Sequence, residues 1–186
     1  MRKLKLQVQM SVDGFVAGPD GEMDWMTWEW DEKLMKYVGD LTEPVDCILL
    51  GRKMAKGFID SWEGRAAEQG PAEPFSMKMD NTVKVVFSQT LRHIDWKNAT
   101  LADRKLDDYV NWLKEQEGGD IIVYGGAGFV ASLIRHNLID DYFLFINPAA
   151  IGKGLPIFTG KLPLRLVSST AFDCGITAQH YQPVKP

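Results

Sequence analysis

Residues 120–133 read DIIVYGGAGFVASL. The apolar run 121–123 has the length and composition of a buried strand, whereas Phe129, Val130 and Leu133 recur at helical spacing. The glycines between the two runs predict a tight turn that leads from a strand into a helix. Such a turn leaves backbone N–H groups without partners at the helix N-terminus, and glycine lets a ligand come close to the main chain.

Two interpretations of this turn remain open. Phosphate and diphosphate groups bind readily at helix N-termini, and residues 126–131 (GAGFVA) match the dinucleotide pattern G-x-G-x-x-G/A. A full Rossmann fold also requires an acidic residue at the end of the next strand, but that strand opens with Asp140 and Asp141 and closes at Asn147. The turn is therefore either a backbone cradle for a phosphate or simply a place where helix and strand pack tightly.

Length, charge and cysteine usage narrow the class of protein. A chain of 186 residues predicts a single α/β domain over residues 1–186. The net charge of −4 argues against a nucleic-acid-binding surface, and the alternating start MRKLKL argues against a signal peptide or membrane span. Cys47 and Cys174 lie far apart and are expected to be free thiols, so we predict a cytoplasmic protein that interacts with neither nucleic acid nor membrane.

Strand and helix patterns alternate along most of the chain. We expect strands at 4–10, 45–50, 82–87, 121–123, 142–146, 164–170 and 176–181, and helices at 31–41, from 52, at 104–116 and from 129. Residues 60–81, rich in Gly, Pro, Glu and Met, are expected to form an irregular excursion with one helical turn. This order predicts a three-layer α/β/α sandwich with a mostly parallel central sheet and antiparallel C-terminal strands.

Ligands of such sheets bind beyond the carboxyl ends of the strands, where several unusual segments converge. One is the glycine-rich loop 11–21, which is either a mobile ligand wall or a surface hairpin. Arg52 and Lys53 begin a helix, where cations are unfavourable by about 0.3–1 kcal/mol unless an anion binds; the alternative is a solvated basic helix end. Ser88 and Gln89 follow a third strand, and this serine either holds a phosphate or only closes a turn.

Five motifs occur in an order that resembles the dihydrofolate reductase fold family, in particular its branch similar to the RibD C-terminal domain of riboflavin biosynthesis. These motifs are SVDGFVA (11–17), LGRK (50–53), VFS (86–88), YGGAG (124–128) and NP…IGKGLPIF (147–158). The resemblance covers essentially the whole chain. It implies NADPH as the cofactor and a homodimer as the assembly.

The resemblance also implies a set of cofactor-binding residues. Those implied are Ala17, Gly18 and Tyr124 beside the nicotinamide, Gly51, Arg52, Lys53, Ser88 and Gln89 around the adenosine phosphates, and Gly125, Gly126, Ala127 and Gly128 under the diphosphate. An arginine fork suits a phosphate monoester, which favours NADPH over NADH if Arg52 or Arg92 reaches it. Met54 stands where family members usually carry threonine.

The sequence also contains candidates for catalytic and substrate-binding residues, and each of them has an alternative structural role. Asp13 borders the implied substrate site as an acceptor or proton donor, or it stabilises its own turn. Glu29 lies near the place where folate reductases carry a carboxylate, although it is equally an exposed acid at a helix start. Trp25 offers a stacking surface for a substrate, or packs in the core or a dimer interface, and Asn147 is a further substrate candidate.

Together these features predict an NADPH-dependent reductase of a small planar heterocycle, similar to a pteridine or pyrimidine, or of a carbonyl compound. The cofactor carries the chemistry, so the protein mainly positions donor and acceptor. The alternative is a non-catalytic nucleotide-binding or structural protein that keeps this fold. No metal is expected, because His93, His136 and His180 show no ligand spacing.

Overall fold

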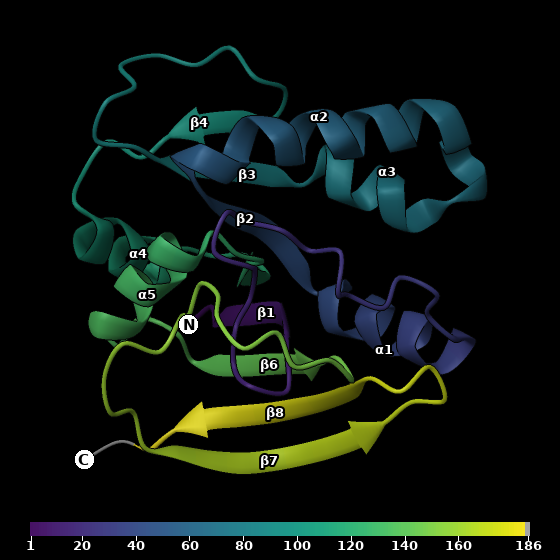
Figure 1. The fold of residues 1–186 in the computed structure, drawn as a ribbon. Helices are drawn as coiled ribbons and strands as arrows, with labels where there is room; N and C mark the ends of the chain where they lie inside the picture. The colour runs from purple at the N-terminus through teal and green to yellow at the C-terminus, as the bar shows by residue number, and fades with distance from the viewer. Residues whose placement is uncertain (185–186) are drawn as a thin grey trace.

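The computed structural model describes residues 1–184 and contains one eight-stranded sheet flanked by helices (Figure 1). The strands are β1 (Leu4–Met10), β2 (Val45–Gly51), β3 (Val83–Phe87), β4 (Ala99–Leu101), β5 (Asp120–Val123), β6 (Asp141–Ile146), β7 (Leu164–Ala171) and β8 (Thr177–Pro183). The helices are α1 (Glu32–Thr42), α2 (Arg52–Gln69), the 3₁₀ turn η1 (Gly70–Ala72), α3 (Pro74–Asn81), α4 (Leu106–Glu115) and α5 (Ala127–Arg135). Within residues 1–184, every helix is too short or too polar to cross a membrane.

The sheet has the order β4-β3-β2-β5-β1-β6-β8-β7. The strands from β4 to β6 run parallel, whereas β8 pairs antiparallel with β6 and β7 antiparallel with β8. Helices α4 and α5 cover one face, and α1, α2 and α3 cover the other (Figure 1). The predicted sandwich with a mostly parallel sheet and antiparallel C-terminal strands is therefore confirmed.

The two faces of the sheet are packed differently. Under α4 and α5, the even-numbered residues of β1 join one continuous apolar core. On the opposite face the core is split into a cluster of α1 with Phe143 and Phe145 of β6, and a cluster of α2 and α3 with β2, β3 and β5. Between these two clusters, the central strand β1 presents the polar side chains of Lys5, Gln7 and Gln9. The gap in the apolar packing therefore lies over the middle of the sheet.

Leu4, Leu6, Val8 and Met10 alternate with polar residues in β1, a pattern that predicts a strand with one buried face, but the structure covers both faces. Lys5 and Gln7 keep only 9% and 6% of their surface exposed, because α1 and α2 flank the strand on their side. The Lys5 ammonium is neutralised by Asp120 at 2.8 Å and donates to the Leu41 carbonyl at 3.1 Å. A central strand with a polar but covered face marks a polar site rather than a solvated surface.

Residues 60–81 are not the irregular excursion that their composition predicted. Helix α2 continues to its end at Gln69, and α3 follows after one 3₁₀ turn. The helical pattern of α2 is weak because two of its three buried residues, Ala55 and Ala66, are small. Its glycines at 57 and 64 face open space, where helix geometry is tolerated. The three-residue edge strand β4 was also not predicted.

Candidate functional site

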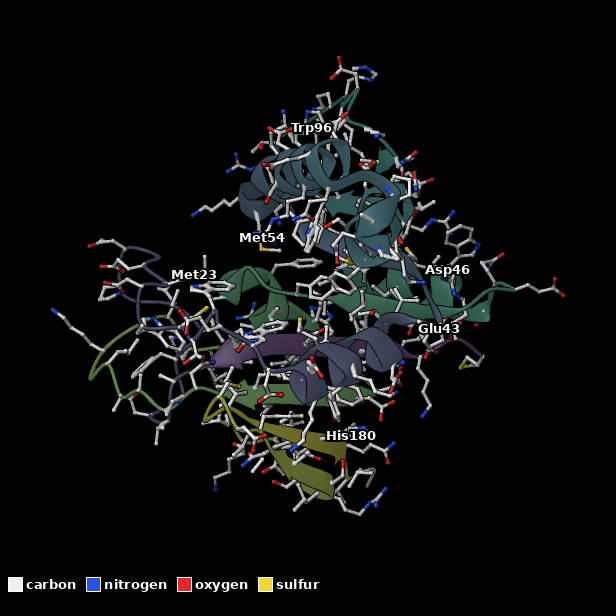
Figure 2. The ribbon with its side chains drawn as sticks, turned by 90° about the vertical axis from the view of Figure 1, so that its right-hand side faces the viewer. Met23, Glu43, Asp46, Met54, Trp96 and His180 are labelled. Atoms are coloured by element: carbon white, nitrogen blue, oxygen red, sulfur yellow. The ribbon has the colours of Figure 1, made fainter. Side chains whose placement is uncertain are left out.

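A cleft of about 2700 Å³ begins at the carboxyl ends of the strands and continues along the sheet between α1 and the α2–α3 pair. We call the first part the rim, lined by residues 51–53, 88–89 and 124–128, and the second part the groove, lined by Gln7, Gln9 and the facing sides of the three helices. Met23 and Glu43 lie at opposite ends of this cleft (Figure 2).

Two helix N-termini meet at the rim. Helix α2 begins after Gly51 at the end of β2, and α5 begins after Gly126, just beyond the end of β5. Because β2 and β5 are neighbours in the sheet, the two helix starts are neighbours as well. Within residues 1–184, no side chain caps either helix start. Both helix dipoles and their free N–H groups therefore favour a bound anion here.

The glycines of the rim have separate reasons to be glycine. Gly126 has a φ of 75°, a backbone conformation that residues other than glycine rarely adopt. A Cβ on Gly51 would lie 2.8 Å from the Phe129 Cβ, so this glycine serves the close packing of α5 on β2. A Cβ on Gly128 would meet nothing within 4 Å. Gly51 is therefore explained by tight packing, whereas the space at Gly128 in the turn 124–128 is open, and the phosphate cradle there stays a prediction.

Cations and a serine complete the rim. Arg52 and Lys53 are exposed in the first turn of α2, and Arg92 lines the same cleft. The Ser88 hydroxyl oxygen accepts hydrogen bonds from the backbone N–H groups of Thr90 at 3.1 Å and Leu91 at 2.9 Å. Ser88 therefore closes its own turn, and its hydroxyl proton remains available to a ligand.

The loop 11–21 forms the wall opposite α2 and is fixed in place. Val16 N–H donates to the Leu155 carbonyl at 3.0 Å, and Leu155 N–H donates to the Ala17 carbonyl at 2.8 Å. Ala17 lines the cleft. Gly18 is buried beside Glu22, and a Cβ there would meet the far end of that flexible side chain. Its place beside the nicotinamide stays a prediction.

An aromatic wall, not predicted from the sequence, lines the α2–α3 side of the groove. Phe58 stacks on Tyr124 with a centroid distance of 5.6 Å, and Trp62 meets Phe75 edge-on at 5.5 Å. Burial raises the pKa of Tyr124, whose hydroxyl donates to the Met79 sulfur at 3.5 Å. The signal in the sequence was the i, i+4 spacing of Phe58 and Trp62, which is visible only once residues 52–69 are read as one helix.

Comparison with known proteins identifies the family to which this chain belongs. The sequence model of one family, described as the RibD C-terminal domain, matches residues 2–178. The chain belongs to this family. It is 32% identical over 181 residues to the uncharacterised protein YyaP of Bacillus subtilis, covering 94% of this chain and 92% of that one. It is 23% identical over 173 residues to the riboflavin biosynthesis protein RibD of Corynebacterium ammoniagenes, and the match covers 89% of this chain but only 49% of that protein.

Solved structures of the same kind share the fold of this RibD C-terminal domain protein. A Thermotoga maritima diaminohydroxyphosphoribosylaminopyrimidine deaminase/5-amino-6-(5-phosphoribosylamino)uracil reductase aligns with a TM-score of 0.69 at 20% identity, over 98% of this chain and 57% of that one. A pyrimidine reductase-like protein from Corynebacterium diphtheriae aligns with a TM-score of 0.65 at 12% identity, over 100% and 93% of the two chains.

In this member of the RibD C-terminal domain family, Asp13 joins two loops. Its carboxylate accepts hydrogen bonds from Gly152 N–H at 2.7 Å and from Ile151 N–H at 3.1 Å. The Ser11 hydroxyl, followed by these backbone N–H groups, holds the pKa of Asp13 below its usual range. The lowered pKa keeps Asp13 ionised at neutral pH, so this residue is unsuited to proton donation. Its carboxylate ties loop 11–21 to residues 151–152, a contact between two loops and not only within its own turn.

The predicted acid and tryptophan before α1 also lie apart from the groove lining. Glu29 is exposed between Trp28 and Trp30, and these two tryptophans line the cleft. The Trp25 indole N–H instead donates to the Glu22 carbonyl at 3.2 Å, within its own loop. Trp28 and Trp30 therefore offer aromatic surface to the cleft, and stacking of a substrate on these tryptophans stays a prediction.

Asn147 lies under the floor of the cleft with no exposed surface. Its Nδ2 donates to the Gln9 Oε1 at 2.8 Å and to the Phe145 carbonyl at 3.2 Å, and its Oδ1 accepts from Thr27 N–H at 2.9 Å. The side chain therefore ties the tryptophan-rich loop to β1 and β6. Asn147 reaches the cleft only through Gln9, as a positioning residue.

Met54 stands between the two parts of the cleft. Its sulfur would lie 3.6 Å from a Cβ on Gly125, and it approaches from the α2 side of the cleft (Figure 2). It offers an apolar contact where the resemblance implied a threonine hydroxyl. Backbone N–H groups and cations are therefore the main groups that the rim offers to a ligand.

Proposed function

We propose that the protein is an NADPH-dependent reductase of a small planar heterocyclic or carbonyl compound. One observation carries this proposal: two adjacent helix N-termini, at Gly51 and Gly126, both lack side-chain caps and share a rim with Arg52 and Lys53. This arrangement suits a ligand that has a diphosphate and a further phosphate group. Membership of the RibD C-terminal domain family supports the same reading.

The residues present fit this cofactor. The N–H groups that begin α5, at Ala127 and Gly128, would hold the diphosphate, and Arg52, Lys53 and Arg92 would hold the 2′-phosphate. Ala17 and Tyr124 would border the nicotinamide where the rim meets the groove. The bound cofactor supplies a hydride, and this chain orients the two reactants in a cleft that limits access of water. Asp13 and Glu29 are left out of this machinery because neither belongs to the cleft lining.

A direct experiment separates a reductase from the alternative, a nucleotide-binding protein without activity. The purified protein is mixed with NADPH, and its melting temperature and the absorbance of reduced nicotinamide are followed with a panel of pteridines, pyrimidines and ketones. A reductase shows a rise in melting temperature and a substrate-dependent loss of absorbance. Binding without oxidation across the whole panel would support the alternative.

Replacing Arg52 with alanine tests the choice between the two nicotinamide cofactors. We expect about a tenfold loss of NADPH affinity and little change for NADH, because only NADPH carries a phosphate monoester for the guanidinium to pair with. Lys56→Ala is the matched control, since Lys56 lies one turn further along α2 and pairs with Asp60. Equal losses for NADPH and NADH in Arg52→Ala would contradict the assignment.

A further inference from the structure

We propose that the groove binds an uncharged, planar ring compound that carries ring N–H and C=O groups and no phosphate, and that the side-chain amides of Gln7 and Gln9 recognise its polar edge. This inference rests on the proposed function, because it names the class of compound that the reductase would reduce. It differs from the substrate named for the Thermotoga maritima protein, a phosphoribosylaminouracil.

The first observation is an unsatisfied acceptor in the floor of the groove. Gln7 is 6% exposed and lines the cleft, and its Oε1 has no hydrogen-bond partner among residues 1–184. Leaving a buried carbonyl unpaired is costly, and native proteins do so rarely. A ligand N–H group placed over β1 would remove this cost.

The second observation is that the neighbouring amide is held in one orientation. Thr27 N–H occupies the Asn147 Oδ1, so Asn147 turns its Nδ2 toward Gln9 and fixes the Gln9 oxygen. The Gln9 NH₂ group is then left to donate toward the cleft that this residue lines. Because Gln7 and Gln9 are two positions apart on β1, they point to the same face. The floor thus presents an acceptor and a donor to one ligand edge.

The shape of the groove indicates a flat ligand. Phe58, Tyr124, Trp62 and Phe75 form a continuous aromatic wall beside this floor. Aromatic walls favour planar rings because stacking covers a face of the ring and leaves the polar atoms on its edge free to pair. A pteridine or pyrimidine-type ring combines such a face with N–H and C=O groups on its edge.

The distribution of charge argues against a phosphate on this ligand. Arg52 and Lys53 belong to the rim, and Arg92, Arg104 and Lys105 follow the carboxyl ends of β3 and β4. At the far end of the groove, the Lys78 ammonium donates to the Glu43 carbonyl at 2.7 Å, next to the acidic Glu43 side chain. Arg65 lies over the Trp62 ring at 5.1 Å and is engaged there. Among residues 1–184, the groove therefore lacks the free cationic cluster that a phosphate monoester requires.

The test measures by calorimetry how three ligands bind to wild type, to one variant and to a control variant. Two of the ligands differ only in a 5′-phosphate. The probes are lumazine, a neutral bicyclic ring with N–H and C=O groups, and 5-amino-6-ribosylaminouracil with and without its 5′-phosphate, kept without oxygen. Each is titrated into wild type and Gln7→Leu, with and without NADPH. Gln116→Leu is the control, because this exposed glutamine is outside the cleft lining and its side chain, among the described residues, donates only to the Trp112 carbonyl.

We expect the uncharged rings to bind, the 5′-phosphate to give no gain in affinity, and Gln7→Leu to weaken binding by about tenfold. We also expect Gln7→Leu to melt at the same or a higher temperature than wild type, because it removes an unpaired buried acceptor. A purely structural glutamine would not show this combination. Gln116→Leu should bind as wild type does.

Four results would overturn the inference: tighter binding of the 5′-phosphate form by tenfold or more, unchanged ring affinity in Gln7→Leu, a clear fall in its melting temperature, or no binding of any uncharged ring. Failure of the proposed function looks different. Rings that bind in the groove of a protein with no affinity for NADPH would refute the reductase and leave the groove assignment intact. NADPH binding without ring binding would refute the groove assignment and leave the proposed reductase intact.

Discussion

Gly126→Val is expected to lower NADPH affinity by about 100-fold or more, the largest functional effect of any single change at the rim. Gly126 has a φ of 75° and provides the residue before α5. A β-branched residue is strained there by about 1–3 kcal/mol, so the turn rearranges and the N–H groups at the start of α5 no longer converge. Calorimetric titration with NADPH measures the loss.

Gly128→Ala is the variant that separates binding from folding. A Cβ at this position meets nothing within 4 Å, and alanine is favoured over glycine inside a helix by about 0.5–1 kcal/mol. We expect this protein to melt at a higher temperature than wild type and yet to bind NADPH about tenfold more weakly, because the methyl group narrows the cradle. Unchanged NADPH affinity in both glycine variants would contradict the assignment of the diphosphate site to this turn.

Asn147→Ala is expected to lower the free energy of unfolding by about 3 kcal/mol, or Tm by about 6–12 °C. The substitution removes the partner of two half-buried groups, Thr27 N–H and Gln9 Oε1, and it opens a small cavity at a position with no exposed surface. Urea unfolding measures the change. Asn111→Ala, at an exposed position on α4, is the control and should change stability by less than about 0.5 kcal/mol. If Asn147→Ala also changed stability by less than about 0.5 kcal/mol, Asn147 would not be the residue that holds the tryptophan-rich loop to β1.

The rim was predictable because its signals are local. A glycine at positive φ, a glycine in close contact, and two cations at a helix start all stand beside the ends of predicted strands. A parallel sheet brings those strand ends together whatever the remaining contacts are. The chain order of strands and helices was sufficient for the sheet type, and the family assignment agrees with it.

The groove was not predictable in the same way. The polar face of β1 has the same alternation as a solvated strand, and only the position of β1 in the middle of the sheet shows that Gln7 is covered. The aromatic wall depends on reading α2 to its end at Gln69 through two glycines. Asp13 and Asn147 are chemically suited to a site, but their partners come from residues more than 100 positions away. The homodimer and the cytoplasmic location stay predictions.

A structure of the protein with NADPH bound would show whether the rim is the cofactor site. We expect one cofactor per chain, with its diphosphate on the N–H groups of Ala127 and Gly128, its 2′-phosphate against Arg52, and its nicotinamide beside Ala17 at the entrance to the groove. A cofactor bound elsewhere, or a rim that stays closed to NADPH at saturating concentration, would contradict this expectation.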